Sequence, residues 1–554
     1  MKSKILMMAL AGLFSAGVGA QTIYDAANLT ELDLNGSARF VGMGGAMSAL
    51  GGDLSTMGTN PAGIGIYRSN DASVSFGFSS YGTESSYMGG NPISADKTRG
   101  SFDHAGFVFS TKIGNRTALR YVNFGFSYKR AKSFCRDMQM AGNLGSFSQT
   151  FQMANQAQGI TGWGNYPYED SEIGWLSIMG YDGYLITDLA SASEVAELGV
   201  AYEAYTQNGT QVSNTSGELM YRTPGYYRGM YEGGDANFLS RERGGIDQYD
   251  FNVSFNVNDR VYLGVTIGAY AVDYSKYSFY DEDYGNGEGY NLQTWSKIKG
   301  SGFDVKLGAI FRPFENSPLR VGLAIHTPTF YDLDYKTNAR LESDVHNYLS
   351  VANESGVESD AVGQYDIDTY DILGGDMVRQ FQLRTPWKYN VSLGYTIGTR
   401  WALGAEYEYQ DYSTAEFRDA EGYSETFAYE NSTTGMLKGV STVRLGLEYK
   451  IAPQFAFRLG YNYRSSIFKD DAYKDLPYNS IQTDTDFANS KSLSNYTVGL
   501  GYRGSVFYAD VAYKYTTYKA DFYPIDMFDG ESLVQATKLD NTRSQVLLTL
   551  GVRF

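Results

Sequence analysis

The strongest constraint on the fold is a repeated alternation of apolar residues with polar or small ones, which runs from residue 72 to the C-terminus. In 443–451, one face carries Val, Leu, Leu, Tyr and Ile, and the other carries Arg, Gly, Glu and Lys. A period of two is that of a β-strand. Each segment has roughly ten residues, the length that a tilted strand needs to cross a bilayer. The pattern therefore predicts strands that span a membrane with one face toward lipid.

Fourteen segments of this kind can be counted. They are 72–80, 104–113, 119–130, 247–257, 260–274, 293–312, 319–332, 378–398, 400–412, 441–451, 454–466, 491–503, 505–518 and 543–554. Short turns such as 114–116 alternate with long polar loops such as 131–246. In outer-membrane barrels the short turns are periplasmic and the long loops extracellular. The sequence thus predicts an all-β fold, a 14-stranded antiparallel transmembrane β-barrel with both ends periplasmic.

The first 20 residues have the order of a secretory signal peptide. Lys2 and Lys4 come first, an apolar run follows, and small residues lead to Ala20. The apolar run is too short for a membrane helix. We expect cleavage between Ala20 and Gln21 and localisation in the outer membrane of a Gram-negative cell. The single cysteine, Cys135, excludes an intramolecular disulfide.

The composition argues against several functional classes. A net charge of −17 disfavours nucleic acid, which requires a basic surface. His104, His326 and His346 lie far apart, and no pair has the spacing of metal ligands. We therefore expect no enzyme activity, no cofactor and no metal site. The acidic tip 280–290 has oxygen ligands at alternate positions, which suits either calcium or a solvated loop.

The stretch 32–67 fits neither a strand nor a good helix, because it is rich in Gly and Ala and nearly uncharged. Near its end, Asn60-Pro61-Ala62-Gly63 predicts a turn, since the residue before Pro is biased away from helix and Pro and Gly punctuate turns. Gly42-Met43-Gly44-Gly45-Ala46 lacks the preceding strand and the third glycine of a phosphate-binding loop. Fourteen strands close the wall without this stretch, so we expect it inside the barrel.

The same residues resemble a known family. Ser37-Ala38-Arg39, Gly42 to Ala46, Gly51-Gly52-Asp53 and Asn60 to Ile64 together resemble the N-terminal segment of the FadL/TodX/OmpP1 family of outer-membrane transporters for hydrophobic compounds. The later strands, such as Val391 to Tyr395 and Asn495 to Tyr502, are similar to those of the same family. The resemblance covers residues 36–554, apart from the loop 131–246.

The resemblance implies a division into a signal peptide at 1–20, an N-terminal hatch or plug at 21–70 and a barrel at 71–554. It implies passive, TonB-independent uptake of hydrophobic or amphipathic small molecules, such as long-chain fatty acids or aromatic hydrocarbons, by a monomer. The hatch motif is then Gly42, Gly44, Gly45, Asn60, Pro61, Ala62 and Gly63. The terminal Phe554 resembles the signal read by the barrel assembly machinery. Outer-membrane lipid or lipopolysaccharide would be a further partner.

Two other functions stay open on the sequence. Charged residues on the inward faces of the late strands favour a porin for polar solutes. Seven long loops favour a surface adhesion or display protein that the barrel anchors. The apolar clusters in 131–246 predict one or two short helices, which form either a lid packed on itself or a surface for an apolar ligand.

Overall fold

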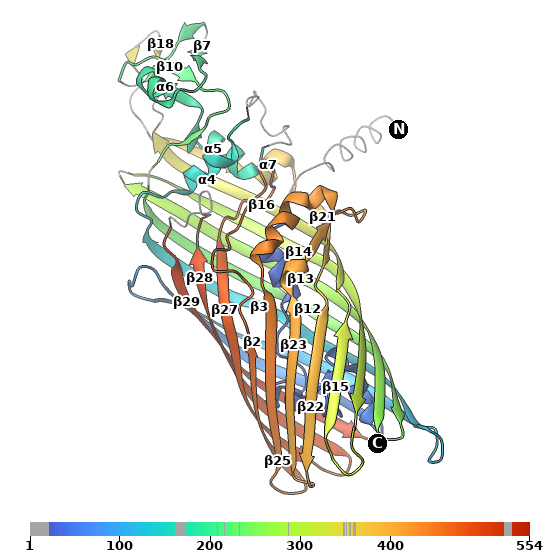
Figure 1. Ribbon diagram of the computed structural model, residues 1–554. Helices are drawn as coiled ribbons and strands as arrows, with labels where there is room; N and C mark the ends of the chain where they lie inside the picture. The colour runs from blue at the N-terminus through green and yellow to red at the C-terminus, as the bar shows by residue number, and fades with distance from the viewer. Residues whose placement is uncertain are drawn as a thin grey trace.

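The computed structural model forms one tall, tilted barrel with an extracellular cap at one end (Figure 1). It describes residues 21–160, 173–207, 209–214, 216–231, 233–285, 287–346, 349–350, 352–353, 356–357, 362–525 and 534–554. The predicted signal peptide, 1–20, lies outside the described residues. Among the residues described, no helix is both long and apolar enough to cross a membrane.

Fourteen antiparallel strand positions close the wall, which confirms the predicted fold class. The strands are β1 (Asp71–Ser86), β2 (Ile93–Lys112), β3 (Leu119–Asn143), β12 (Asp235–Val257), β13 (Val261–Gly285), β14 (Glu288–Phe311), β15 (Arg320–His326) with β16 (Phe330–His346), β21 (Met377–Arg384) with β22 (Lys388–Ile397), β23 (Trp401–Asp411), β25 (Gly439–Lys450), β26 (Phe455–Arg464), β27 (Phe487–Arg503), β28 (Phe507–Tyr523) and β29 (Thr537–Arg553). β29 pairs with β1 from Arg553↔Asp71 to Lys538↔Ser86, which closes the sheet into a barrel.

Two of the predicted continuous strands are broken. The segment 319–332 is interrupted between β15 and β16 at Pro328, and 378–398 between β21 and β22 at Pro386. Proline has no N–H for the ladder, so the strand cannot continue through it. The two breaks face each other, because β15 pairs with β22 and β16 with β21.

Several strands are much longer than the predicted ten or so residues, because the alternation changes phase partway along them. On β13, Leu263, Val265 and Ile267 point outward and are exposed. Beyond them the buried apolar residues are Tyr270, Val272 and Tyr274, which point inward. The lower part is a lipid-facing belt, and the upper part is a wall in water with an apolar inner face. In Figure 1, β12 to β16 rise well beyond the belt on one side.

The extracellular cap lies between β3 and β12. Because both strands extend beyond the membrane, the predicted loop 131–246 shortens to 144–234. Its described residues contain three helices, where the sequence predicts one or two: α4 (Gln149–Gln156), α5 (Trp175–Asp182) and α6 (Ala192–Leu198). Its short strands are β4 (Ile186–Thr187), β5 (Leu189–Ser191), β6 (Glu203–Ala204), β7 (Thr206–Gln207), β8 (Thr210–Gln211), β9 (Ser213–Asn214), β10 (Met220–Arg222) and β11 (Arg228–Gly229).

The apolar residues of the cap pack on each other and on the upper wall. Met153, Leu176 and Met179 belong to one buried cluster with Tyr274 and Leu341 of the strands. Glu282 of β13 fixes the start of α4, since its carboxylate accepts hydrogen bonds from the Ser148 hydroxyl and the Gln149 N–H. This arrangement agrees with a lid rather than with an exposed apolar surface.

The remaining elements fill the mouth and the lumen. Above the wall are β17 (Leu349–Ser350), β18 (Ala352–Asn353), β19 (Gly356–Val357), β20 (Val362–Asp368), α7 (Thr369–Leu373), η4 (Tyr412–Thr414), β24 (Glu416–Arg418), η5 (Glu425–Phe427), α8 (Ala428–Thr433) and η6 (Thr434–Met436). Inside the barrel are α2 (Ile23–Thr30), α3 (Ala38–Gly42), η1 (Leu54–Gly58) and η2 (Pro61–Ile66).

The change of phase on β13 generates a prediction. Ile267→Lys places a charge in the lipid-facing belt and should lower the free energy of unfolding by about 2–4 kcal/mol. Ser275→Lys lies on the same face above the belt, and its effect should stay within about 0.5 kcal/mol. Denaturant unfolding of the barrel in lipid vesicles measures the free energy of unfolding of both variants. Equal losses in the two variants would contradict the assigned height of the belt.

Candidate functional site: the N-terminal segment and the cavity beside it

The residues from Gln21 to Tyr67, here called the N-terminal segment, run down the inside of the barrel. At the extracellular end, Tyr24 of α2 stacks on Phe468 at 4.8 Å and donates a hydrogen bond to Asn489. At the periplasmic end, the carbonyl of Ile64 in η2 accepts a hydrogen bond from Asn123 of β3. The segment therefore contacts the wall over the whole height of the belt.

A row of glycines in the wall receives the segment. Gly394, Gly404, Gly446 and Gly460 stand opposite one another on β22, β23, β25 and β26, and we name them the glycine row. A Cβ atom at Gly404, Gly446 or Gly460 would lie less than 3.0 Å from backbone atoms of Ala46, Met43 or Gly44. At Gly394 it would lie 3.1 Å from the Leu50 nitrogen. Only residues without a side chain allow the two backbones to approach this closely.

The predicted motif Gly42 to Ala46 is the part of the segment that meets this row. Gly44 and Gly45 have φ of 63° and 80°, the left-handed region that favours glycine. Their N–H groups donate to the carbonyls of Val41 and Phe40, so neither is free for a phosphate. The carbonyl of Gly42 accepts a hydrogen bond from Thr497 of β27. The motif is thus a tight turn against the wall.

Asn60-Pro61-Ala62-Gly63 begins the 3₁₀-helix η2 rather than forming a simple turn. The Asn60 side chain caps this helix by accepting a hydrogen bond from the Ala62 N–H, and proline suits the first helical position because it needs no donor. The carbonyl of Pro61 accepts hydrogen bonds from Ser254 and Asn252 of β12. The motif is completely buried against the periplasmic half of the wall.

Ion pairs fix the segment at two heights. Lower in the barrel, Arg39 pairs with Glu448 at 2.9 Å, and Glu448 also pairs with Arg458 at 2.7 Å. Higher up, Glu31 pairs with Arg464 and with Lys132, the latter at 3.3 Å. Burial alone would raise the pKa of Glu31, but the charges of Arg464 and Lys132 lower it to about 2. Glu31 therefore stays ionised far below neutral pH.

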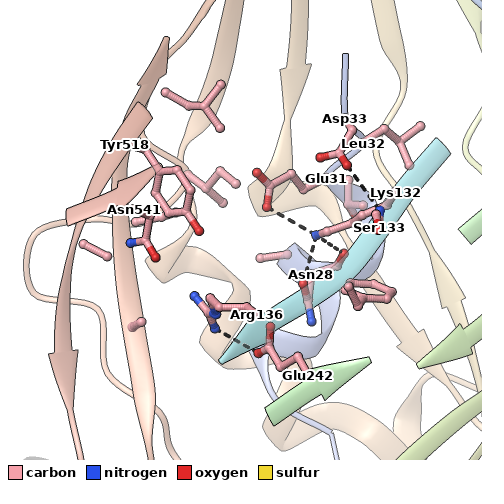
Figure 2. Close-up of a pocket in the computed structure, with 18 of the residues that line it drawn as sticks. Asn28, Glu31, Leu32, Asp33, Lys132, Ser133, Arg136, Glu242, Tyr518 and Asn541 are labelled. Atoms are coloured by element: carbon pink, nitrogen blue, oxygen red, sulfur yellow. Dashed lines mark hydrogen bonds and ion pairs between the residues drawn. The ribbon is translucent and has the colours of Figure 1, made fainter. Parts of the chain in front are cut away.

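A cavity of about 340 Å³ lies beside α2, between the segment and the upper wall. Figure 2 shows Asn28, Glu31 and Lys132 directed toward one another at one side, with Tyr518 and Asn541 facing them from other strands. Eleven Lys or Arg and seven Asp or Glu residues line this cavity, so its side chains carry an excess of positive charge. This excess contrasts with the chain as a whole, whose net charge is −17.

The cavity also has donors without acceptors and an apolar side. The Nε atoms of Arg136 and Arg543 and the Nδ2 atom of Asn541 are buried and have no hydrogen-bond partner among the described residues. The apolar side chains that line the same space are Phe134, Met138, Tyr274, Tyr335, Phe487, Phe522 and Leu539. Buried donors are stabilised by an acceptor. The cavity therefore combines a part whose hydrogen-bond donors lack acceptors with an apolar part.

The wall divides next to this cavity. β2 pairs with β3 only from Lys112↔Tyr121 to His104↔Lys129. Beyond that point β2 continues with β1, and β3 continues with β12 after a bulge near Ala131. The segment binds the departing strand there, since the Asp33 N–H donates to the Ala131 carbonyl at 2.8 Å.

Other predicted sites lie apart from this cavity. Phe554 is exposed at the periplasmic end, where its backbone pairs with Asn70. Gln21 is buried, whereas Ala20 lies outside the described residues. In the loop tip 280–290, Asn286 is also outside them. Within the described ranges, no group of three or more His, Cys, Asp or Glu residues is placed to hold a metal ion.

Sequence reasoning missed two parts of the site. The cavity cations Lys132, Arg136 and Arg543 come from β3 and β29, far apart in the chain, and no local pattern marks them. The glycine row had a signal: each of four late strands carries one interior glycine, and these positions become opposite when the strands are paired.

Three comparisons relate the chain to known proteins. A family model described as BamG matches residues 231–469, which is less than half of the chain. No curated protein matches the sequence. Among solved structures, the toluene transporter TodX of Pseudomonas putida is 11% identical with a TM-score of 0.46, and the alignment covers 94% of this chain and 99% of TodX. A FadL homologue of Pseudomonas aeruginosa is 13% identical, with the same TM-score and coverages. The toluene transporter TbuX of Ralstonia pickettii is 14% identical with a TM-score of 0.43, at 94% and 99% coverage.

The glycine row generates a second prediction. Gly404→Ala places a Cβ against the Ala46 carbonyl, which should displace the segment and cost about 1–3 kcal/mol of stability. We expect single-channel conductance in planar bilayers to rise. Gly435→Ala is the matched control, because its Cβ would meet nothing within 4 Å. Unchanged conductance in a folded Gly404→Ala barrel would argue against close contact between the N-terminal segment and the glycine row.

The ion pairs of Glu31 generate a third prediction. Because its pKa is lowered to about 2, its contribution to docking is complete above its ordinary pKa of about 4.3 and is lost as the pH falls toward 2. In bilayer recordings, the wild type should stay closed from pH 7 to about pH 5 and begin to open below about pH 4. Glu31→Gln should show altered closure already at pH 7 and little further change over this acid range. A wild type and variant with the same pH profile would exclude Glu31 as the anchor.

Proposed function

We propose that the chain is an outer-membrane channel for the passive, TonB-independent uptake of amphipathic small molecules, with the N-terminal segment as its hatch. The observation that carries the proposal is a cavity open to both apolar and anionic groups, next to a segment that occupies the lumen. In this proposal a solute enters the cavity from the extracellular side and meets the segment before it reaches the periplasm. A porin for polar solutes would instead need a continuous aqueous path.

The charges of the cavity favour an anionic amphiphile over a purely apolar cargo. An apolar molecule offers no acceptor to the buried donors of Arg136, Arg543 and Asn541, whereas a carboxylate or a similar acidic group can accept a hydrogen bond from donors of this kind. The aromatic and aliphatic side would receive the tail. TodX and TbuX are toluene transporters, whereas the present cavity favours a more polar ligand.

Two exits are compatible with this arrangement. One leads downward and requires the segment to move from the glycine row. The other leads through the division between β2 and β3 into the bilayer. The contact of Asp33 with Ala131 joins the segment to this division, so movement of one would affect the other.

Deletion of residues 21–65 tests the hatch. The deleted barrel should conduct ions steadily in planar bilayers, while the full chain shows little open-channel conductance. If the full chain is already a large open pore, the porin alternative gains support and the hatch is excluded. Loss of adhesion without loss of uptake, after the extracellular loops are shortened, would instead favour the surface-display alternative.

A ligand pair tests the class of cargo. Decanoate should bind the reconstituted protein more tightly than its uncharged methyl ester, and Arg136→Gln should weaken decanoate binding about tenfold, as expected for loss of a charged hydrogen bond. Arg241→Gln, an exposed site on β12, is the control and should change neither ligand. The assignment fails if Arg136→Gln affects both ligands equally or neither.

The match to the BamG model favours a second role, association with the barrel assembly machinery. Affinity purification of the full chain from outer membranes in a mild detergent tests it. Recovery of the other machinery subunits in fixed proportion supports the role, and recovery of the chain alone contradicts it.

A further inference from the structure

The periplasmic end of the barrel has a charge opposite to that of the whole molecule. Its strand ends and short turns, here called the periplasmic rim, are 68–71, 112–120, 258–260, 312–320, 398–400, 450–454, 503–506 and 553–554. The rim contains eleven Lys or Arg side chains and three Asp or Glu side chains, a net charge of +8. The remaining residues therefore carry −25, since the chain carries −17. Turns that merely face water would not require positive charge to gather at the rim while the rest of the chain is negative.

Several rim cations are exposed and unpaired. Lys112, Arg116, Arg400 and Lys450 all lie in exposed positions. None of these four forms an ion pair with any residue in the part of the chain that the structure describes. By contrast, Arg260 pairs with Glu315 at 2.7 Å. Four cations thus have no ion-pair partner among the described residues to neutralise them.

These cations are next to the apolar belt. Lys112 precedes Ile113, Arg400 precedes Trp401, and Lys450 precedes Ile451 in the sequence. The three apolar neighbours are exposed by 49%, 39% and 60% on the outer surface. Trp401, at the end of the belt, marks the membrane interface. Alternation places Lys112, Arg400 and Lys450 on the inward face, opposite these neighbours, but each stands at or beside the end of a strand, where a long side chain extends past the wall toward the headgroup level. The cations therefore lie at the depth of the lipid phosphates.

Their distribution distinguishes between two kinds of partner. The four cations come from the turns after β2, β22 and β25. Arg312 and Arg503, which also form no ion pair with a described residue, follow β14 and end β27, so the positive charge is spread around the barrel. A docked protein would contact one side, whereas lipid surrounds every side. Anionic headgroups attract basic residues at a membrane surface, and phosphate is a preferred partner of Arg. We propose that the periplasmic rim binds anionic phospholipid headgroups of the periplasmic leaflet.

The proposal is independent of transport, and lipid composition tests it. The full chain is reconstituted in vesicles of phosphatidylethanolamine with a minor fraction of phosphatidylglycerol. Native mass spectrometry then measures which lipid stays bound to the released barrel. Since each cation near an anionic surface contributes roughly fivefold in affinity, we expect phosphatidylglycerol to be enriched several-fold over its fraction in the vesicle.

Two charge-matched variants locate the binding. K112Q/R116Q/R400Q/K450Q removes the four unpaired rim cations and should bring the enrichment close to one. R241Q/K297Q/K336Q/K469Q removes four exposed cations at the extracellular end and should leave it unchanged. The change of migration on heating in gels checks that both variants are folded barrels.

Three outcomes overturn the proposal: no enrichment in the wild type, an unchanged enrichment in the folded rim variant, or an equal loss in both variants. Rim-dependent capture of an acidic periplasmic protein, without enrichment of phosphatidylglycerol, also overturns it in favour of a protein partner. Loss of enrichment in the rim variant alone supports it.

Discussion

Direct contact between two backbones determines how this barrel is filled. The N-terminal segment lies against the glycine row, where the wall offers no side chain, and Ala46, Met43 and Gly44 approach the strands more closely than any Cβ would permit. Glycine in a strand interior costs conformational entropy, of the order of 0.5–1 kcal/mol relative to alanine. Its presence on four neighbouring strands is explained by the space that the segment needs. The ion pairs of Arg39 and Glu31 then fix the segment in height.

The N-terminal segment also contacts the place where the wall divides. Asp33 binds β3 at the bulge where that strand leaves β2, and Arg543 of β29 pairs with Asp33 from the other side at 2.8 Å. The segment thus joins the last strand to the irregular part of the wall. The cavity beside it is bounded by charged groups that mostly neutralise one another, with an excess of cations and a distinct apolar side. This combination is the basis on which we propose a cargo with one anionic end rather than a hydrocarbon.

The number of strands could be predicted from the sequence because lipid imposes a strict alternation on each crossing. The full strand lengths could not, since the pattern changes phase where the wall leaves the membrane: Ile267 points to lipid, but Tyr270 and Val272 point inward. The prolines themselves signal the breaks at Pro328 and Pro386. The apolar alternation continues on either side of each proline, so the pattern predicts one strand for each segment. In the candidate site, the low charge and glycine content of 32–67 are visible in the sequence. The wall residues that meet it are not, because contacts such as Glu31 with Arg464 depend on the closure of the whole barrel.

The N-terminal segment is seated in the lumen on the glycine row, and we propose that it closes the lumen. A cysteine pair tests this most directly. A Cβ at Gly42 would lie 3.7 Å from the Cβ of Ala512, a separation typical of disulfides. In a protein with Gly42→Cys, Ala512→Cys and Cys135→Ser, we predict that mild oxidation of outer membranes forms the cross-link. The locked barrel should then remain closed to ions in planar bilayers. Free thiols after oxidation, or a steadily conducting barrel with the cross-link in place, would contradict the claim.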